Sequence, residues 1–231
     1  MIPRIALTTT RDRAVRLASL CEEHGLEPVH VPCIEFVPAD EGVLDPTRRR
    51  IGQADWLVVT SARAISALWP EGGMPDLPVA AVGSATAQAV SDAGGQPVVV
   101  GDGGAGELID LVAGRLGGAS VAFPHAVGAG TATIEALQSA GASVHARAVY
   151  EIRPVPPVAD PVDAVVFGSP TAVRGWLLSR GLEGLVVGAI GETTAGALAE
   201  VAVAADVEPR HPSFERLIAR MAEHMRDWSA V

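Results

Sequence analysis

The stretch ADWLVVTSARAISALWPEGGMPDLPVAAVGSATAQAV, residues 54–90, occurs a second time as VDAVVFGSPTAVRGWLLSRGLEGLVVGAIGETTAGAL, residues 162–198. The two copies align without a gap at an offset of 108 positions, which matches Asp55 with Asp163. In each copy an apolar strand runs into a Ser/Thr-rich turn that starts a helix, and this happens twice. Such turns present the free backbone N–H groups of helix N-termini. The repeat therefore predicts a protein that holds an anionic ligand between two similar halves.

A second repeat organises the rest of the chain. Residues 3–39 resemble residues 120–155 at an offset of 116 positions. The order is therefore A–B–A′–B′, where A is a strand–helix–strand unit and B is the longer unit quoted first. Two extended, proline-containing stretches, 33–46 and 150–161, follow the same kind of strand, and we expect them to carry the chain from one unit into the next.

This order predicts two domains with swapped connectivity. A would pair with B′ in a first, discontinuous α/β domain of residues 1–36 plus 153–231. B would pair with A′ in a second α/β domain of residues 37–152. The two connectors would then lie side by side as a hinge.

The predicted strands are short, rich in Val, Ala and Ile, and nearly continuous in apolar character, which is typical of a parallel sheet covered on both faces. We expect them near residues 4–8, 28–36, 55–60, 79–82, 97–100, 120–124, 143–152, 163–167, 186–190 and 203–207. Helices are expected at 11–24, 62–69, 84–93, 106–116, 131–140, 170–179, 192–200 and 213–226. Strands that alternate with helices indicate the α/β class.

Composition favours a cytoplasmic chain of two modest domains. The 231 residues carry a net charge of −10, which argues against a nucleic-acid partner. No apolar run approaches the roughly 18 residues of a membrane span, and the first residues lack the apolar stretch of a secretory signal. Cys21 and Cys33 lie in apolar segments without CxxC spacing, so we expect reduced thiols in the core.

Other motifs leave weaker alternatives. The segment GDGGAG, residues 101–106, fits the GxGxxG pattern of a dinucleotide site. The next strand ends at Pro124-His125 instead of in the acidic residue that would hold a ribose, which favours a mobile loop. The six histidines show no HxH or HExxH spacing, so no metal site is predicted. GxSxG is absent around Ser61 and Ser169, which argues against a serine hydrolase.

Five segments in order, with a tyrosine between the halves, carry a resemblance to a known family. They are VVTSARA (58–64), AAVGSATAQAV (80–90), GASVHARAVYEIRP (141–154), DAVVFGSPTAVRGW (163–176) and AIGETTAGAL (189–198). The segment HPSFERLI (211–218) adds a final loop-and-helix pattern. With these features the chain resembles the uroporphyrinogen-III synthases, which are cofactor-free cyclases of tetrapyrrole biosynthesis.

The resemblance implies two flavodoxin-like domains joined by a two-stranded ladder. It implies hydroxymethylbilane, a linear tetrapyrrole with eight carboxylates, as substrate and uroporphyrinogen III as product. Loss of the terminal hydroxyl would give an azafulvene cation, which is attacked by ring D to form a spiro-pyrrolenine that reopens and recloses with ring D inverted. It also implies transient contact with the deaminase that supplies the substrate, and no membrane partner.

Tyr150, the only tyrosine in the chain, matches the family tyrosine and is the predicted catalytic residue. A phenol can donate a hydrogen bond to the departing hydroxide without becoming a stable ion. The alternative is a structural tyrosine whose ring covers the hinge.

Hydroxyl side chains at the predicted strand-to-helix turns are the candidate ligands of the substrate carboxylates. They follow the carboxyl ends of strands, where open α/β sheets bind ligands. Helix N-termini there add a partial positive charge, contributing about 0.3–1 kcal/mol each when exposed. The predicted substrate-binding residues are Ser61, Ser84, Thr86, Ser169, Thr193, Thr194 and Arg11. Ser and Thr at such positions also cap helices for stability alone, and that alternative stays open.

Arginines near the expected cleft edges could pair with acetate or propionate groups of the substrate. They are Arg11, Arg63, Arg147, Arg153 and Arg174. The run Arg48-Arg49-Arg50 is expected to be a solvated helix face instead.

Two departures from the family pattern keep a second function open. Thr8-Thr9-Thr10 separates the first strand from Arg11, and Gly168 stands where the family has Thr or Ser. The alternative is a non-catalytic or re-purposed two-domain protein of the same fold that binds an anionic small molecule.

Overall fold

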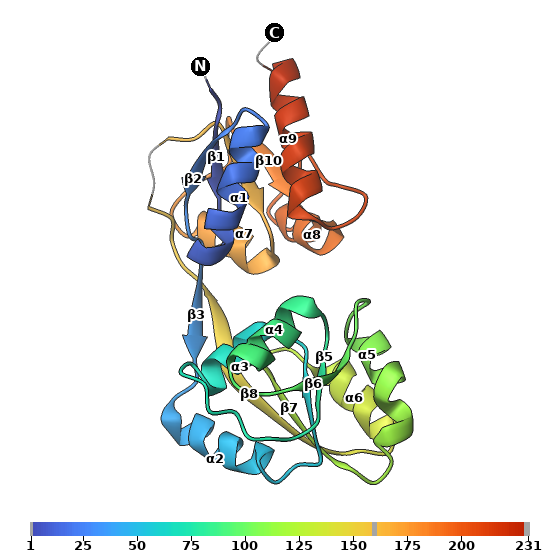
Figure 1. The fold of residues 1–231 in the computed structure, drawn as a ribbon. Coiled ribbons are helices and arrows are strands. Elements are labelled where there is room, and N and C mark those ends of the chain that lie inside the picture. Colours follow the sequence, from blue (N-terminus) through green and yellow to red (C-terminus); the bar gives the residue numbers. More distant parts are fainter. Residues whose placement is uncertain (1, 159–160, 229–231) are drawn as a thin grey trace. The chain divides into compact units, whose positions relative to one another are not determined.

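The computed structural model describes residues 2–158 and 161–228, which divide into two compact units (Figure 1). Unit 1 is discontinuous and comprises Met1–Phe36 and Ile152–Val231, whereas unit 2 is the uninterrupted stretch Val37–Glu151. Both units are built from parallel strand pairs with helices, so the predicted α/β class is confirmed.

Unit 1 holds a four-stranded sheet in the order β10-β9-β1-β2, with parallel pairing throughout. Its strands are β1 (Arg4–Leu7), β2 (Glu27–His30), β9 (Ala164–Phe167) and β10 (Val186–Ala189). Its helices are α1 (Arg11–Glu23), α7 (Pro170–Leu177), α8 (Glu192–Ala199) and α9 (Phe214–Trp228). Alternate strand residues face opposite ways, so two cores form, one under α1 and α9 and one under α7 and α8.

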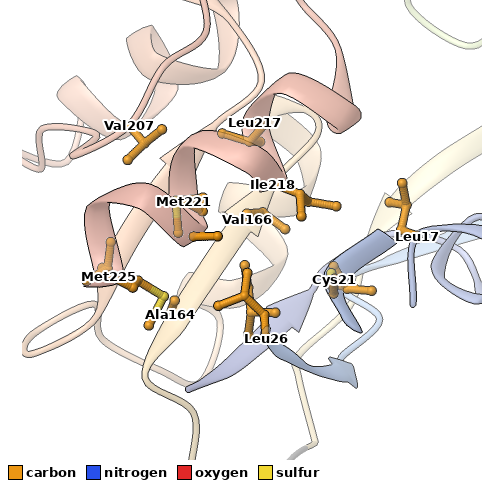
Figure 2. Close-up of a cluster of buried hydrophobic side chains, with 14 of the residues drawn as sticks. Leu17, Cys21, Leu26, Ala164, Val166, Val207, Leu217, Ile218, Met221 and Met225 are labelled. Atoms are coloured by element: carbon orange, nitrogen blue, oxygen red, sulfur yellow. The ribbon is translucent and has the colours of Figure 1, made fainter. Parts of the chain in front are cut away.

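The α9 core shows why the last helix is amphipathic. Leu217, Ile218 and Met221 of α9 belong to one buried cluster with Val166 of the sheet (Figure 2). Gly188 of β10 leaves room for this contact, because a Cβ there would lie 2.7 Å from the Met221 sulfur. The helix thus seals one face of the sheet of unit 1.

Unit 2 contains most of a six-stranded sheet in the order β3-β8-β7-β4-β5-β6. Its strands are β3 (Ile34–Pro38), β4 (Trp56–Val59), β5 (Val79–Ala81), β6 (Pro97–Val100), β7 (Ser120–Ala126) and β8 (Ser143–Pro154). Its helices are α2 (Glu41–Ile51), α3 (Ala62–Leu68), α4 (Ser84–Asp92), α5 (Ala105–Val112) and α6 (Thr131–Ser139), with a short 3-10 helix η1 (Ala113–Arg115). Side chains of α5 and α6 pack on one face of this sheet.

Two strand predictions were wrong in detail. The strand expected near 28–36 is two strands, β2 and β3, in different sheets. Pro32 lies in the break, and because it has no backbone N–H it cannot continue a ladder. The strand expected near 203–207 is only a single parallel bridge from Gly188 to Val207.

The prediction that residues 33–46 are extended throughout was also wrong, because α2 begins at Glu41 and contains Pro46. Leu44 and Ile51 are buried two turns apart on one face of this helix. Arg48, Arg49 and Arg50 lie in its last turn, where cations stabilise the helix dipole. These contributions outweigh the one hydrogen bond that the proline removes.

The two aspartates that match in the repeat, Asp55 and Asp163, each accept a backbone hydrogen bond from a neighbouring strand. The Asp55 carboxylate accepts a hydrogen bond from the Ser120 N–H at 2.8 Å, and the Asp163 carboxylate accepts one from the Arg4 N–H at 2.8 Å. Each of these hydrogen bonds lies at the start of the pairing between two neighbouring parallel strands. The repeat therefore encodes strand register at this position.

Both cysteines are free and fully buried, which confirms the prediction of core thiols. Burial raises the pKa of the Cys21 thiol to about 11 and that of Cys33 to about 12. Since only a thiolate reacts, we expect iodoacetamide at about pH 8 to modify neither cysteine in the folded protein and both after denaturation. Intact-mass spectrometry measures this, and an adduct formed on the folded protein would contradict it.

Candidate functional site

In unit 2, four predicted site residues gather at one edge of the sheet. The register pairs Val59 of β4 with Ala81 of β5, so the turns that follow these strands lie at the same edge. These turns carry Ser61, Ser84 and Thr86. Tyr150 of β8 is paired with Ala126, the last residue of β7, and so lies at this carboxyl edge too.

In unit 1, the other four predicted site residues occupy the corresponding edge. Leu7 of β1 is paired with Val166 of β9, and Phe167 of β9 is paired with Ala189 of β10, so these three strands end at the same edge. The turns after these three strands lead into α1, α7 and α8. They carry Arg11, Ser169, Thr193 and Thr194.

Ser61 and Ser169 cap helices. The Ser61 hydroxyl accepts a hydrogen bond from the Arg63 N–H at 3.2 Å, and that of Ser169 accepts one from the Ala172 N–H at 3.3 Å. Each hydroxyl keeps its hydrogen, which can be donated to an acceptor such as a carboxylate. Capping and ligand binding are therefore compatible at these two positions.

The first turns of α4 and α8 are organised differently, because their N-cap residues are Gly83 and Gly191, which have no side chain to cap with. In the described ranges, the N–H groups of the first two residues of each helix have no hydrogen-bond partner. Unpaired N–H groups at a helix N-terminus favour an anion. Ser84 and Thr193 are exposed beside them.

Thr86 and Thr194 are the third residues of these helices and are 5 % and 2 % exposed. Their N–H groups donate to the carbonyl oxygens of Gly83 and Gly191 at 3.0 and 2.9 Å. The two threonines thus have matching backbone environments in the two units. Their side chains lie deeper than those of Ser84 and Thr193.

Tyr150 is 6 % exposed. Its carbonyl oxygen accepts a hydrogen bond from the Val127 N–H at 2.8 Å, just beyond the end of β7. This bond ties the tyrosine backbone to the loop at the carboxyl edge.

Arg11 is exposed and is the first residue of α1, with Thr10 as N-cap. The preceding threonines have a role that sequence reasoning missed. The Thr8 hydroxyl is buried and donates to the Val166 carbonyl oxygen at 2.7 Å, while Thr9 is 6 % exposed. The sequence pattern that could have predicted this role is the run of three consecutive threonines directly after a strand.

The other predicted arginines are spread over several elements. Arg63 and Arg174 lie on α3 and α7, and the Arg174 guanidinium is 3.5 Å from the Thr171 hydroxyl. Arg147 and Arg153 lie on β8, where both are exposed.

Gly168, the departure from the family pattern, has a packing reason. A Cβ at this position would lie 2.4 Å from the Phe214 ring of α9. The same ring has the Arg13 guanidinium over it at 5.6 Å from its centroid. The ring takes the space that a Thr or Ser side chain would need, so the departure belongs to the docking of α9.

The glycine loop before α5 does not favour a dinucleotide. Gly104 adopts a φ of +104° at the helix N-cap, which requires glycine. A Cβ on Gly103 would lie 1.7 Å from a Glu107 carboxylate oxygen, so this acidic side chain folds over the loop. Its charge would repel a pyrophosphate.

Residues 2–158 and 161–228 contain neither a membrane-spanning helix nor a metal-binding cluster. No helix there is both long enough and apolar enough to span a bilayer. No group of three or more His, Cys, Asp and Glu side chains there could hold a metal ion.

Comparisons with known proteins agree on one family. The sequence model described as uroporphyrinogen-III synthase HemD matches residues 15–219. No protein with a curated description matches the chain significantly. Among solved structures, uroporphyrinogen-III synthetase from Helicobacter pylori is 17% identical with a TM-score of 0.69, covering 98% of this chain and 100% of that one. A mutant uroporphyrinogen III synthase from Thermus thermophilus is 21% identical with a TM-score of 0.57, covering 99% and 100%.

Proposed function

The chain belongs to the uroporphyrinogen-III synthase family, and on that premise we propose that Tyr150 and the hydroxyl-bearing turns of its units carry the cyclisation. The reaction converts hydroxymethylbilane to uroporphyrinogen III, with inversion of ring D and loss of water through a spiro intermediate. The chain is thus an enzyme of heme biosynthesis, and the match over residues 15–219 is the observation that carries this conclusion.

The proton balance of the reaction asks for one modest acid and base. The terminal hydroxyl leaves as water and takes up one proton, while ring D loses one proton from its α-carbon as its pyrrole becomes aromatic again. A phenol can donate the first proton and recover the second, so Tyr150 alone suffices for both transfers. Water is eliminated without an added co-reactant, which makes the enzyme a lyase. The position of Tyr150 opposite Ala126, at the carboxyl edge of the sheet, supports its role in proton transfer.

Conformational control is the larger part of the catalysis. The open substrate closes unaided to the uninverted isomer, so the enzyme must hold the chain in the geometry that lets ring D react at its substituted carbon. The substrate carboxylates would be bound by the N–H groups and hydroxyls of the turns that begin α3, α4, α7 and α8, with Arg11 at the start of α1. Local dipoles of this kind let a protein with a net charge of −10 bind a polyanion.

The free thiols Cys21 and Cys33 are consistent with a reducing compartment, and we place the reaction in the cytoplasm. Transient contact with the preceding deaminase would shorten the time in which the released substrate can close to the uninverted isomer.

A coupled assay tests the function. Porphobilinogen and a deaminase generate hydroxymethylbilane in place, and the oxidised porphyrins are separated by chromatography. We expect isomer III to dominate when the protein is present. Isomer I alone, formed beside protein whose circular dichroism shows it folded, would favour the non-catalytic binding protein.

Thr86→Val and Thr194→Val test the carboxylate contacts. Each keeps the shape of the buried side chain and removes its hydroxyl, so we expect KM to rise about tenfold with little change in kcat. The control Thr86→Ser keeps the hydroxyl and should retain a KM near that of the unmodified protein. Unchanged KM in both valine variants would assign the threonines to the packing of the turn.

A further inference from the structure

A pocket of about 360 Å³ lies within unit 2, away from the carboxyl edge. Its walls are α2 on one side and the middle of β7 and the first half of β8 on the other, and in Figure 1 α2 is light blue, β7 yellow-green and β8 yellow. Neither Tyr150 nor any of the hydroxyl-bearing turn residues lines it, and Arg147 is the one predicted arginine that does. We call it the α2 pocket. It is a cavity of ligand size, at the small end of the usual range.

The α2 pocket is basic in an acidic protein. Arg50 comes from α2, and His145 and Arg147 come from one face of β8, two residues apart. No acidic residue is among the described residues that line the pocket. The Arg50 guanidinium donates to the His145 ring, with Nη2 2.5 Å from Nε2. A buried wall of Ile51, Ala122 and Phe123 backs these groups.

The cations of the pocket are not neutralised by their neighbours. Glu41 and Asp45, the carboxylates of α2, both bind Arg48, at 2.6 and 2.7 Å. The hydrogen bond from Arg48 lowers the pKa of Glu41, so this carboxylate is engaged elsewhere. Among the described residues, neither Arg50 nor Arg147 forms an ion pair. Two guanidinium groups thus face a concave, partly apolar surface without an anion.

The internal repeat shows that the fold does not require these side chains. At the offset of 116 positions, His145 corresponds to Val29 and Arg147 to Val31. Val31 is fully buried in the core of unit 1, and Val29 packs against the same cluster. One copy of the repeat therefore fills this place with apolar side chains, and the other opens it and lines it with basic side chains.

From this difference we propose that the α2 pocket binds a compact organic acid, with one ring and one or two carboxylate or phosphate groups, separately from the tetrapyrrole. Arg50 and Arg147 hold the anionic groups by charge-assisted hydrogen bonds, and the ring lies on the Ile51 and Phe123 side. The volume suits a single ring and excludes a four-ring substrate.

Calorimetric titration of the full chain with phthalate, at low ionic strength, tests the proposal. We expect saturable binding, and about a tenfold higher Kd in Arg50→Gln and in Arg147→Gln, or about 1.4 kcal/mol each. The matched control is Arg49→Gln, which removes an equal charge from the neighbouring residue of α2 outside the pocket and should change Kd by less than about twofold. Amide shifts in α2 and β8, recorded by NMR, should accompany binding.

Inorganic phosphate is the probe for charge alone, and it should bind more weakly than phthalate because it makes no contact with the apolar wall. The proposal is overturned by the absence of saturation up to about 10 mM phthalate, by equal losses in Arg49→Gln and Arg50→Gln, or by amide shifts confined to the turns at Ser84 and Thr193. Equal affinity for phosphate and phthalate would overturn the assignment to an organic acid. Since the readout is binding, failure of the cyclase assay leaves it unaffected.

Discussion

Gly175→Ala is expected to lower the free energy of unfolding by about 3 kcal/mol or more. Gly175 lies inside α7, and a Cβ there would be 2.0 Å from the Cys33 carbonyl oxygen and 2.9 Å from that of Val155. Both obstacles are backbone atoms. They are also tied together, because the Val155 N–H donates to the Cys33 carbonyl oxygen at 3.0 Å. Neither can rotate away as a side chain would, so α7 must shift.

Gly196→Ala is the matched control, since Gly196 also lies inside a helix of unit 1 but has open space around its Cα. There the substitution should be neutral or should stabilise the protein by up to about 1 kcal/mol, because alanine favours the helix. Urea unfolding monitored by circular dichroism gives both values. Equal effects of the two substitutions would show that α7 can move aside at little cost.

Tyr150→Phe is expected to slow the formation of isomer III by about 100-fold while leaving the protein folded, because it removes a single proton donor and keeps the ring. The coupled assay would then show a larger share of isomer I, which forms without the enzyme. Initial rates at saturating substrate separate this effect on kcat from any loss of binding.

Tyr150→Leu provides the comparison for a structural role. If the ring matters only by covering the backbone at the carboxyl edge, Tyr150→Phe should match the unmodified enzyme and only Tyr150→Leu should lose activity and thermal stability. Turnover of Tyr150→Phe at the unmodified rate would remove the phenol from the chemistry.

Local signals made the strand-to-helix turns predictable from sequence. Ser61 and Ser169 cap helices because each directly follows an apolar strand, and a polar residue after such a strand is a strong local start signal. The carboxylates of Asp55 and Asp163 likewise accept a backbone hydrogen bond from the strand next to their own. Repetition reinforced each of these signals, since the same pattern appears at the same spacing in both copies.

Features that depend on tertiary packing were beyond sequence reasoning. Pro46 suggested an extended segment, but buried Leu44 and Ile51 stabilise a helix around it. The depth of Thr86 and Thr194 depends on how α4 and α8 pack, which no local pattern reports. The α2 pocket joins Arg50 to His145, which are 95 residues apart in the chain. Gly168 is explained only by the ring of Phe214, contributed by the final helix.

Because unit 1 is discontinuous, its two segments leave the ribosome at different times during translation. When β1, α1 and β2 emerge, the β9 strand that pairs with β1 and the α9 helix that packs beside α1 have not yet been translated. Unit 2 is complete at Glu151 and can fold first. Its folding joins β3 to β8, with the Ala39 N–H bonded to the Val149 carbonyl oxygen at 2.9 Å. This pairing holds the N-terminal segment next to β8, from which the chain continues toward β9 and α9. The entropic cost of closing the loop that completes unit 1 is therefore lower.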